Sequence, residues 1–387
     1  MICITDISTT IIYSSEMYSN LIRLRNFKLR FVYRFILKPV FFLADPERVH
    51  DSMTQVGMLL GKHRITQRLM RLMYGYSHPA LVQTIAGITF PNPIGLSAGF
   101  DKDVHLMDIL PDIGFGYEEM GSVTAQRCEG NPKPRLQRLK KSKSLVVYYG
   151  LKNDGALAIH KRLSKRTFGF PLGISIAKTN CKETADMHKG VQDYRESYIL
   201  LHKHADYITL NISCPNAYGG QPFTDKVSLR ELLTAIQEVR GSEPIFIKLS
   251  PDLNESQIND IVELGDEFHI DGYICTNLTK NRKNDRIIDE ITIPGGISGK
   301  VVQDLSDRLI ANIYKKTQGK KIIIGCGGVS SAEDAYKKIK MGASLIQLIT
   351  GMIFEGPQVI SDINIGLVQL LKKDGYSNIS QAVGKGI

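Results

Sequence analysis

The sequence lacks any uninterrupted run of about 18 uncharged apolar residues, the length that a membrane-spanning helix requires. It therefore predicts no transmembrane segment. Cysteine is scarce, with six residues in 387 positions. The six cysteines are scattered and form neither a CxxC pair nor a Cys/His spacing typical of a metal site. These absences argue against a disulfide framework, an iron–sulfur cluster and a protein-bound metal, and they indicate reduced thiols in a cytosol-like compartment.

No GxGxxG motif follows the first apolar run after residue 90, which argues against the dinucleotide-binding form of a doubly wound sheet. Instead, eight short apolar runs alternate with longer segments, mostly helical in pattern. This rhythm over about 260 residues is typical of a (β/α)8 barrel. We predict an α/β fold with a TIM barrel at residues 81–387. The expected strands are Ile94–Ser97, Tyr117–Met120, Leu172–Ile176, Tyr207–Asn211, Ile245–Leu249, Gly272–Cys275, Ile322–Gly325 and Leu345–Leu348.

Acidic residues are absent between Leu21 and Ala44, where six basic residues alternate with large apolar ones. With a formal net charge of +10, this pattern predicts a basic amphipathic helix lying on a membrane surface. A solvated helix packed on its own domain and a mitochondrial presequence are the alternatives, the latter weakened by Asp6 and Glu16. Residues 1–20 have no periodic pattern and are expected to be disordered, and residues 21–80 to form a helical region.

Asp45 and Pro46 are a typical helix start, with Asp45 as N-cap and Pro46 in the first helical position. Met53, Val56 and Leu60 then share one apolar face. Two or three such short helices predict either an apolar tunnel mouth at a membrane or a simple cap on the barrel.

The run Tyr207–Asn211 ends abruptly in polar residues, among them Cys214 and Asn216. Because the active site of a parallel barrel forms where its strands end, we place Asn211, Cys214 and Asn216 on the catalytic face. A lone cysteine after a strand is often only a small buried residue, but the flanking amides favour a functional role. The glycine-rich stretch 217–225 that follows is expected to act as a lid.

Other strand ends add polar groups to the same face. Lys102 follows the first strand, Ser122 the second and Asn277 the sixth, while Lys248 ends the fifth. A buried lysine requires a negative partner, for which a reduced flavin ring and the carboxylate of Asp252 are the alternatives.

Glycine clusters occur beside the last two strands, at Gly295–Gly299, at Gly325–Gly328 and at Gly351 after Thr350. Loops in these places commonly bind phosphate through backbone N–H groups. With a central lysine and no metal ligands, they suggest flavin mononucleotide (FMN). The amides match a pyrimidine-like ring, from which Cys214 would remove a proton while the flavin accepts a hydride.

At this point the sequence resembles dihydroorotate dehydrogenase, the flavin enzyme of pyrimidine synthesis. The motifs that carry the resemblance are Ala44–His50, Gly95–Lys102, Gly130–Leu136, Asn211–Asn216 and Gly296–Gly299. The first motif is similar to the N-terminal extension of the membrane-associated, quinone-dependent class. The resemblance implies oxidation of dihydroorotate to orotate, with electrons passed through FMN to a membrane quinone that the N-terminal helices admit.

Carried over by motif, the resemblance also implies a set of site residues. Cys214 would be the base. Flavin contacts would come from Ala98, Gly99, Lys102, Ser122, Asn211, Lys248, Thr276, Gly299, Gly328 and Thr350, and substrate contacts from Lys102, Gly150, Leu151, Asn211, Asn216 and Asn277. The expected location is peripheral, at the cytoplasmic face of the cell membrane or, alternatively, at the mitochondrial inner membrane.

Three positions depart from the pattern of the quinone-dependent class. Cys214 stands where that class has serine, as in the soluble classes. Val147 occupies the place of an asparagine that holds the pyrimidine ring, and Thr179, beside Asn180, stands in the place of a flavin-contacting asparagine.

Three other functions compete with this interpretation. Val147 motivates another dihydropyrimidine-like substrate or a soluble acceptor such as fumarate. A flavin barrel that reduces uridine in RNA would use the basic stretch 133–143, but no added RNA-binding domain follows the barrel, and we expect no nucleic-acid partner. A non-enzymatic membrane adaptor would bind no flavin.

Overall fold

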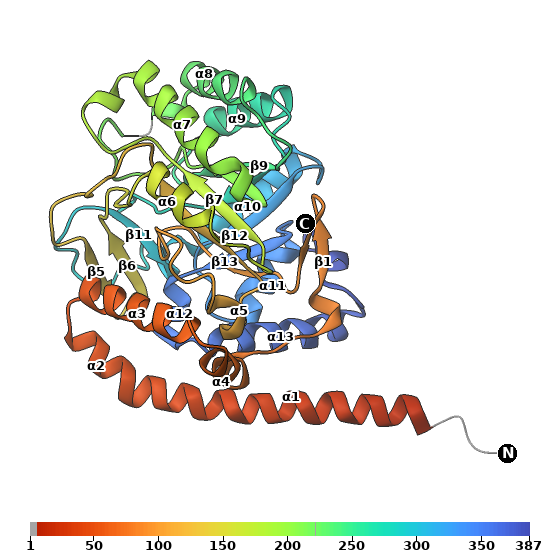
Figure 1. Cartoon of the computed structure of the whole chain (residues 1–387). Helices are drawn as coiled ribbons and strands as arrows, with labels where there is room; N and C mark the ends of the chain where they lie inside the picture. The colour runs from red at the N-terminus through yellow and green to blue at the C-terminus, as the bar shows by residue number, and fades with distance from the viewer. Residues whose placement is uncertain (1–5, 221) are drawn as a thin grey trace.

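A computed structural model describes residues 6–220 and 222–387 of the chain. Eight parallel strands close into a barrel in the order β10-β12-β13-β3-β4-β7-β8-β9, with helices around it (Figure 1). The predicted TIM barrel is therefore confirmed. Its strands are β3 (Ile94–Leu96), β4 (Tyr117–Val123), β7 (Leu172–Ile176), β8 (Tyr207–Leu210), β9 (Ile245–Leu249), β10 (Gly272–Cys275), β12 (Ile322–Cys326) and β13 (Leu345–Leu348).

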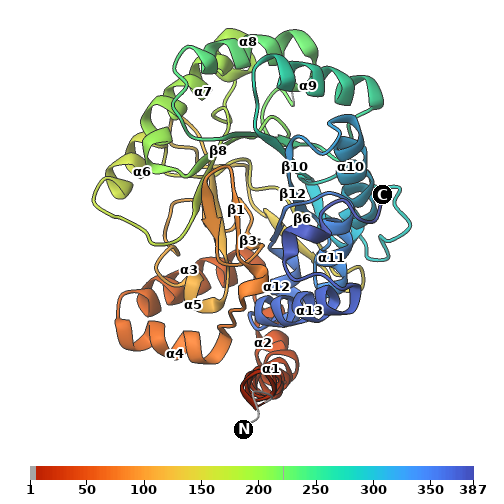
Figure 2. The ribbon, with the colours of Figure 1, turned by 90° about the vertical axis from the view of Figure 1, so that its right-hand side faces the viewer.

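Long helices follow most of the barrel strands and cover the outside of the barrel (Figures 1 and 2). They are α6 (Ala156–Leu163), α7 (Met187–Leu201), α8 (Lys226–Gln237), α9 (Glu255–Glu267), α10 (Gln303–Lys316), α11 (Ala332–Lys340) and α13 (Val359–Asp374). Two shorter helices, α5 (Leu110–Ile113) and α12 (Thr350–Glu355), follow β3 and β13.

The barrel interior is filled at one end by aromatic rings. Tyr117 and Tyr207 are fully buried, and each ring lies against a glycine on the neighbouring strand. A Cβ atom at Gly95 would lie 2.3 Å from Tyr117 Cζ, and one at Gly173 would lie 2.1 Å from Tyr207 Cζ. Glycine is therefore required at these positions for close packing. The hairpin of β1 (Gln83–Ile85) and β2 (Ile88–Phe90) supplies Phe90, whose ring contacts Tyr117 edge-on.

A small antiparallel sheet stands beside the barrel. It consists of β5 (Leu136–Leu139), β6 (Ser144–Val147) and β11 (Gly296–Gly299), in the order β11-β6-β5. Gly296 is paired with Val147, and Gly299 with Ser144. This pairing brings the glycine cluster of residues 295–299 next to the segment that contains Val147.

The N-terminal region is helical and lies along one side of the barrel (Figures 1 and 2). It comprises α1 (Asp6–Val32), a π-helical segment (Tyr33–Leu37), α2 (Lys38–Leu43), α3 (Pro46–Gly61) and α4 (Arg64–Tyr74). The predicted start at Asp45 is confirmed, because its side chain accepts a hydrogen bond from the Arg48 N–H at 2.9 Å. The structure corrects the expected disorder of residues 6–20, which belong to α1. Residues 1–5 lie outside the described part of the chain.

Polar contacts with α13 and α4 attach helix α1 to the barrel. Asn26 Nδ2 donates to Ser361 Oγ at 2.7 Å and to Asp362 Oδ1 at 2.8 Å. Arg30 forms an ion pair with Asp362 at 2.6 Å, and Arg25 donates to the Leu72 carbonyl at 2.8 Å. Among the described residues, no helix combines the length and apolar character needed to cross a bilayer.

Glu118 on β4 is an unusual buried carboxyl group. It is fully buried, and neither of its side-chain oxygens has a hydrogen-bond donor among the described residues. Burial raises its pKa well above the usual value, and the nearby Asp101 carboxylate raises it further. A protonated Glu118 can donate a hydrogen bond to Asp101, whereas an ionised one cannot. We therefore expect Glu118 to hold a proton in the folded protein.

Glu118→Gln should alter how stability depends on pH. Above the unfolded-state pKa of about 4.3, the unfolded chain releases the Glu118 proton while the folded chain keeps it, so stability falls as pH rises toward the folded-state pKa. Each unit between the two pKa values lowers the free energy of unfolding by about 1.4 kcal/mol. Urea unfolding at several pH values should show that the free energy of unfolding of the variant increases relative to that of the wild type as pH rises. An equal pH dependence in both proteins would contradict a protonated Glu118.

Candidate functional site

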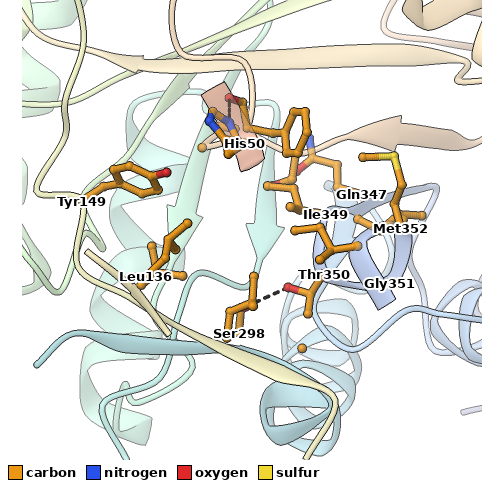
Figure 3. A pocket seen from close by; sticks show the side chains of 18 of the residues that line it. His50, Leu136, Tyr149, Ser298, Gln347, Ile349, Thr350, Gly351 and Met352 are labelled. Atoms are coloured by element: carbon orange, nitrogen blue, oxygen red, sulfur yellow. Dashed lines mark hydrogen bonds between the residues drawn. The ribbon is translucent and has the colours of Figure 1, made fainter. Parts of the chain in front are cut away.

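One cavity of about 440 Å³ joins the C-terminal ends of the barrel strands to the N-terminal helices. Its walls come from three sources, namely the strand ends, the small sheet and helices α2 to α4. Figure 3 shows His50 from α3, Leu136 from β5 and Gln347 from β13 around this space. The helix side is lined mainly by apolar residues such as Phe41, Val49, Met53, Val56 and Leu60.

Lys248 lies on the inner, polar wall of the cavity and is almost fully buried. Its ammonium group is 3.2 Å from Glu119 Oε1 and 3.3 Å from Ser97 Oγ. Glu119 is also bound by Thr209 Oγ1 at 3.1 Å and by Gln347 Nε2 at 3.0 Å. The structural partner of Lys248 is thus Glu119 on β4 and not Asp252.

Asp252 instead accepts hydrogen bonds from Thr279 Oγ1 and from the Lys280 N–H. Glu119 was missed because two glutamates stand side by side in the sequence at positions 118 and 119. Only the pleat of the strand decides which of the two points into the barrel.

Four polar side chains form a connected network in the centre of the site. Asn211 Nδ2 donates to Ser122 Oγ at 2.7 Å, and Asn277 Nδ2 donates to Asn211 Oδ1 at 3.1 Å. Ser122 also shares a hydrogen bond of 2.8 Å with Ser175. This network fixes the orientation of the amides toward whatever occupies the cavity.

Asn216 lies in the loop after β8 and connects this loop to β6 of the small sheet. Its Nδ2 donates to the Val147 carbonyl at 2.8 Å. Val147 lines the cavity, and its side chain offers no polar atom.

Cys214 lines the cavity and is partly exposed. Burial raises the pKa of its thiol, while the Asn216 N–H and the positive charges of Lys178 and Lys280 act in the opposite direction. Lys178 is itself nearly buried and donates to the Tyr218 carbonyl at 2.7 Å. The ammonium group of Lys178 thus acts on the thiol electrostatically and is hydrogen-bonded to the loop predicted to be a lid.

Lys102 stands where the polar and apolar halves of the cavity meet. Its Nζ lies 3.3 Å from the centre of the Tyr149 ring, a cation–π contact. Burial lowers its pKa to about 8, and the like charge of Lys152 contributes. His50 packs beside Phe100 and Tyr149, and its Nε2 is 2.9 Å from the Phe100 carbonyl oxygen.

The glycine-rich end of the cavity contains Gly299, Gly328 and Gly351. A Cβ at Gly351 would lie 2.1 Å from the Val329 carbonyl oxygen, so only glycine allows the two backbone segments to lie this close. Thr350 begins α12 and shares a hydrogen bond of 2.8 Å with Ser298 (Figure 3). The chain thus presents backbone and hydroxyl groups at the end of the cavity, as a phosphate requires.

The structure brings the predicted site residues together around this cavity. It is lined by Ala98, Gly99, Lys102, Ser122, Gly150, Leu151, Asn211, Cys214, Asn216, Lys248, Thr276, Asn277, Gly299, Gly328 and Thr350. What each residue binds stays a prediction.

Thr179 and Asn180 do not line the cavity. Thr179 Oγ1 accepts from the Gln126 N–H at 3.2 Å, and Asn180 Nδ2 donates to Asn131 and to the Gly150 carbonyl. Both residues fasten neighbouring loops to one another.

Comparisons with known proteins identify the family. The family model described as dihydroorotate dehydrogenase matches residues 80–371. The chain belongs to the dihydroorotate dehydrogenase family. The resemblance proposed from the sequence motifs is therefore confirmed, and the protein is an oxidoreductase of this family.

Relatives of the dihydroorotate dehydrogenase family cover almost the whole chain. Proteins from Natronomonas pharaonis and Corynebacterium efficiens, both named dihydroorotate dehydrogenase (quinone), are 37% identical to it over 360 residues. The alignments cover 91% and 92% of this chain and 99% and 94% of those proteins, respectively. The ligand-free crystal structure of DHODH from Eimeria tenella superimposes with a TM-score of 0.79 at 30% identity and covers 88% of this chain and 99% of that chain.

Glu119→Leu should lower the free energy of unfolding by about 3 to 5 kcal/mol, because it leaves the Lys248 charge buried without its partner. The double variant Glu119→Leu/Lys248→Met removes both charges and should recover most of this loss. Urea unfolding of the wild type, of Glu119→Leu, of Lys248→Met and of the double variant measures the coupling.

Removal of the exposed pair Arg230–Glu267 is the matched control and should change stability little. If the double variant is no more stable than Glu119→Leu, the loss of stability does not come from leaving the Lys248 charge without its partner.

Proposed function

We propose that the protein oxidises dihydroorotate to orotate with bound FMN, as a step of pyrimidine biosynthesis, and that its electrons pass to a membrane quinone. The observation that carries the proposal is the continuity of one cavity. It runs from the glycine-rich end, past Lys248 and the asparagines, to Cys214 and then between the N-terminal helices. The names of the relatives, which include the word quinone, support the same reading.

The chain offers a suitable cradle for FMN. The backbone around Gly299, Gly328 and Gly351 can receive a phosphate group, and Ala98 and Gly99 leave room for a flat ring beside the first barrel strand. Lys248 holds a positive charge on the inner wall, and Gln347 Oε1 is buried without a hydrogen-bond donor among the described residues. FMN would supply the two-electron acceptor in this reaction.

The substrate ring is held by amides and a cation in this proposal. Asn211, Asn216 and Asn277 present donors and acceptors to a ring that carries both, and Lys102 is placed to attract the substrate carboxylate. Burial lowers the pKa of Lys102 to about 8, so the side chain can lose its proton near neutral pH. An approaching anion favours the protonated, positively charged form.

Cys214 is the proposed base. Its thiolate removes the proton from the ring carbon next to the carbonyl, and the adjacent carbon gives up hydrogen and two electrons to the acceptor. Lys178 and Lys280 stabilise the thiolate electrostatically, against the effect of burial. The proton then leaves the thiol as the next cycle begins.

The N-terminal helices form the proposed entrance for the quinone. The cavity wall on this side is apolar, and the outer surface of the same region exposes Phe27, Phe31, Ile65 and Leu72. The basic residues of α1 stand among these apolar groups, a combination that suits an anionic lipid surface. We include peripheral attachment to the cytoplasmic face of the cell membrane in the proposal.

Val147 favours a second candidate, a related flavin dehydrogenase for another reduced ring or for a soluble acceptor such as fumarate. A valine side chain at the cavity wall offers no hydrogen bond where the family has an amide, and an unpaired polar group of the ring would cost about 1 to 3 kcal/mol in a dry site. Anaerobic titration with dihydroorotate, followed by flavin absorbance, separates the two candidate substrates. Rapid bleaching supports dihydroorotate, and a flavin that stays oxidised favours another reduced ring. Reoxidation of the reduced flavin by a quinone or by fumarate then separates the two acceptors.

Cys214→Ala should leave flavin bound and slow its reduction by dihydroorotate by about 100-fold or more, because no base remains. In the wild type, the raised thiol pKa means that less thiolate is present at neutral pH, so the rate should rise with pH by about tenfold per unit below that pKa. Anaerobic stopped-flow absorbance measures both effects. Cys181→Ala is the control and should reduce at the wild-type rate, whereas an unaffected Cys214→Ala would remove Cys214 from the mechanism.

Met53→Lys should slow quinone turnover by about tenfold or more, because it places a charge in the apolar passage. Reduction of the flavin by dihydroorotate should be unchanged. The assay uses a short, water-soluble quinone, so that membrane binding does not limit the rate. Leu59→Lys introduces the same charge on the same helix outside the cavity lining and should have little effect. Equal turnover in both variants would show that the quinone enters elsewhere.

A further inference from the structure

A cluster of metal-ligating side chains lies outside the cavity. Asp103 and His105 belong to the loop after β3, and Asp154 precedes α6. One ligand atom from each of the three residues lies within 4.8 Å of the other two. The three side chains are partly exposed, so water and ions can reach them.

Each of the three residues retains an atom that could bind an ion. One Asp103 oxygen accepts the Asp154 N–H at 2.8 Å, and one Asp154 oxygen accepts Arg162 Nη2 at 2.9 Å. The second oxygen of each carboxylate is left over. Among residues 6–220 and 222–387, the His105 ring has no hydrogen-bond partner, although it stands beside both carboxylates.

The electrostatics of the cluster favour a cation. The like charges of the Asp103 and Asp154 carboxylates lie close together, with the Arg162 guanidinium beside them. Arg162 is paired with Asp154 and with the Asp103 backbone carbonyl. A divalent ion would offset the repulsion between the two carboxylates more fully than the single guanidinium charge does.

We propose that Asp103, His105 and Asp154 form a binding site for a divalent first-row metal ion of the Mn²⁺ type. Two carboxylate oxygens and one imidazole nitrogen would be the protein ligands, with water in the remaining positions. Carboxylate and water ligands suit Mn²⁺, and the imidazole distinguishes the site from the all-oxygen shells of Ca²⁺.

The position of the site gives it a structural consequence. Asp103 directly follows Lys102, and Asp154 is two residues after Lys152, and both lysines line the cavity. An ion bound by Asp103 and Asp154 fastens the loop after β3 to the loop before α6. It therefore restrains two segments of the cavity wall from outside.

Titration of the full-length, flavin-loaded protein with Mn²⁺ alone tests the proposal, after treatment with a chelator. Electron paramagnetic resonance distinguishes free from bound Mn²⁺, and Mn²⁺ has little affinity for the cysteine thiols. We expect one bound ion per chain. His105→Ala and Asp154→Asn should each weaken binding by about tenfold or more, since each removes a protein ligand.

His204→Ala is the matched control. It removes one member of another imidazole pair, in which His204 Nε2 is 3.0 Å from His160 Nδ1, and it should leave Mn²⁺ affinity unchanged. Flavin absorbance and the melting temperature without metal show whether each variant is folded. The proposal is overturned if the wild type binds no Mn²⁺, if His105→Ala and Asp154→Asn bind it as tightly as the wild type, or if only His204→Ala loses it.

Discussion

The buried ion pair of Lys248 and Glu119 is the constraint on which the rest of the site depends. A lysine inside a barrel is tolerated only with a negative partner, and Glu119 is held in place by Thr209 and Gln347 as well. The tyrosine-filled end of the barrel lies at the N-terminal side of this charged layer, and the cavity opens at the other side. The barrel thus provides a dry, charged wall against which a flat ring can rest, and the surrounding loops need only supply the groups that recognise it.

The sequence allowed the barrel to be predicted because its strands are short apolar runs with polar residues at their ends. The predicted bounds of β7, β9, β10 and β13 are those observed, and the residues at the strand ends meet around one cavity. The partner of Lys248 could not be predicted, since the pairing of distant strands decides which acidic residue meets it. Thr179 and Asn180 were uncertain for a related reason. After β7 the chain turns away from the cavity, and this turn depends on contacts with Asp193 and Asn131 that no local pattern reveals.

Helix α1 was predicted only in part. Its first residues mix polar and apolar types without a helical period, and the polar contacts that attach it to the barrel come later, at Arg25, Asn26 and Arg30. Helix formation is cooperative, so a segment without its own periodic pattern can continue a helix that is fixed further along the chain. The local pattern therefore predicted the later part of the helix, but not where the helix begins.

The attachment of α1 to α13 has a mechanical consequence. Because the contacts are polar and directional, they fix the angle between α1 and the barrel before any lipid is present. Side chains such as Phe27 and Phe31 stay outside this joint. Helix α1 thus forms a rigid extension of the barrel. A bilayer that receives its apolar side chains would also set the tilt of the whole barrel, and with it the direction in which the apolar passage faces the lipid.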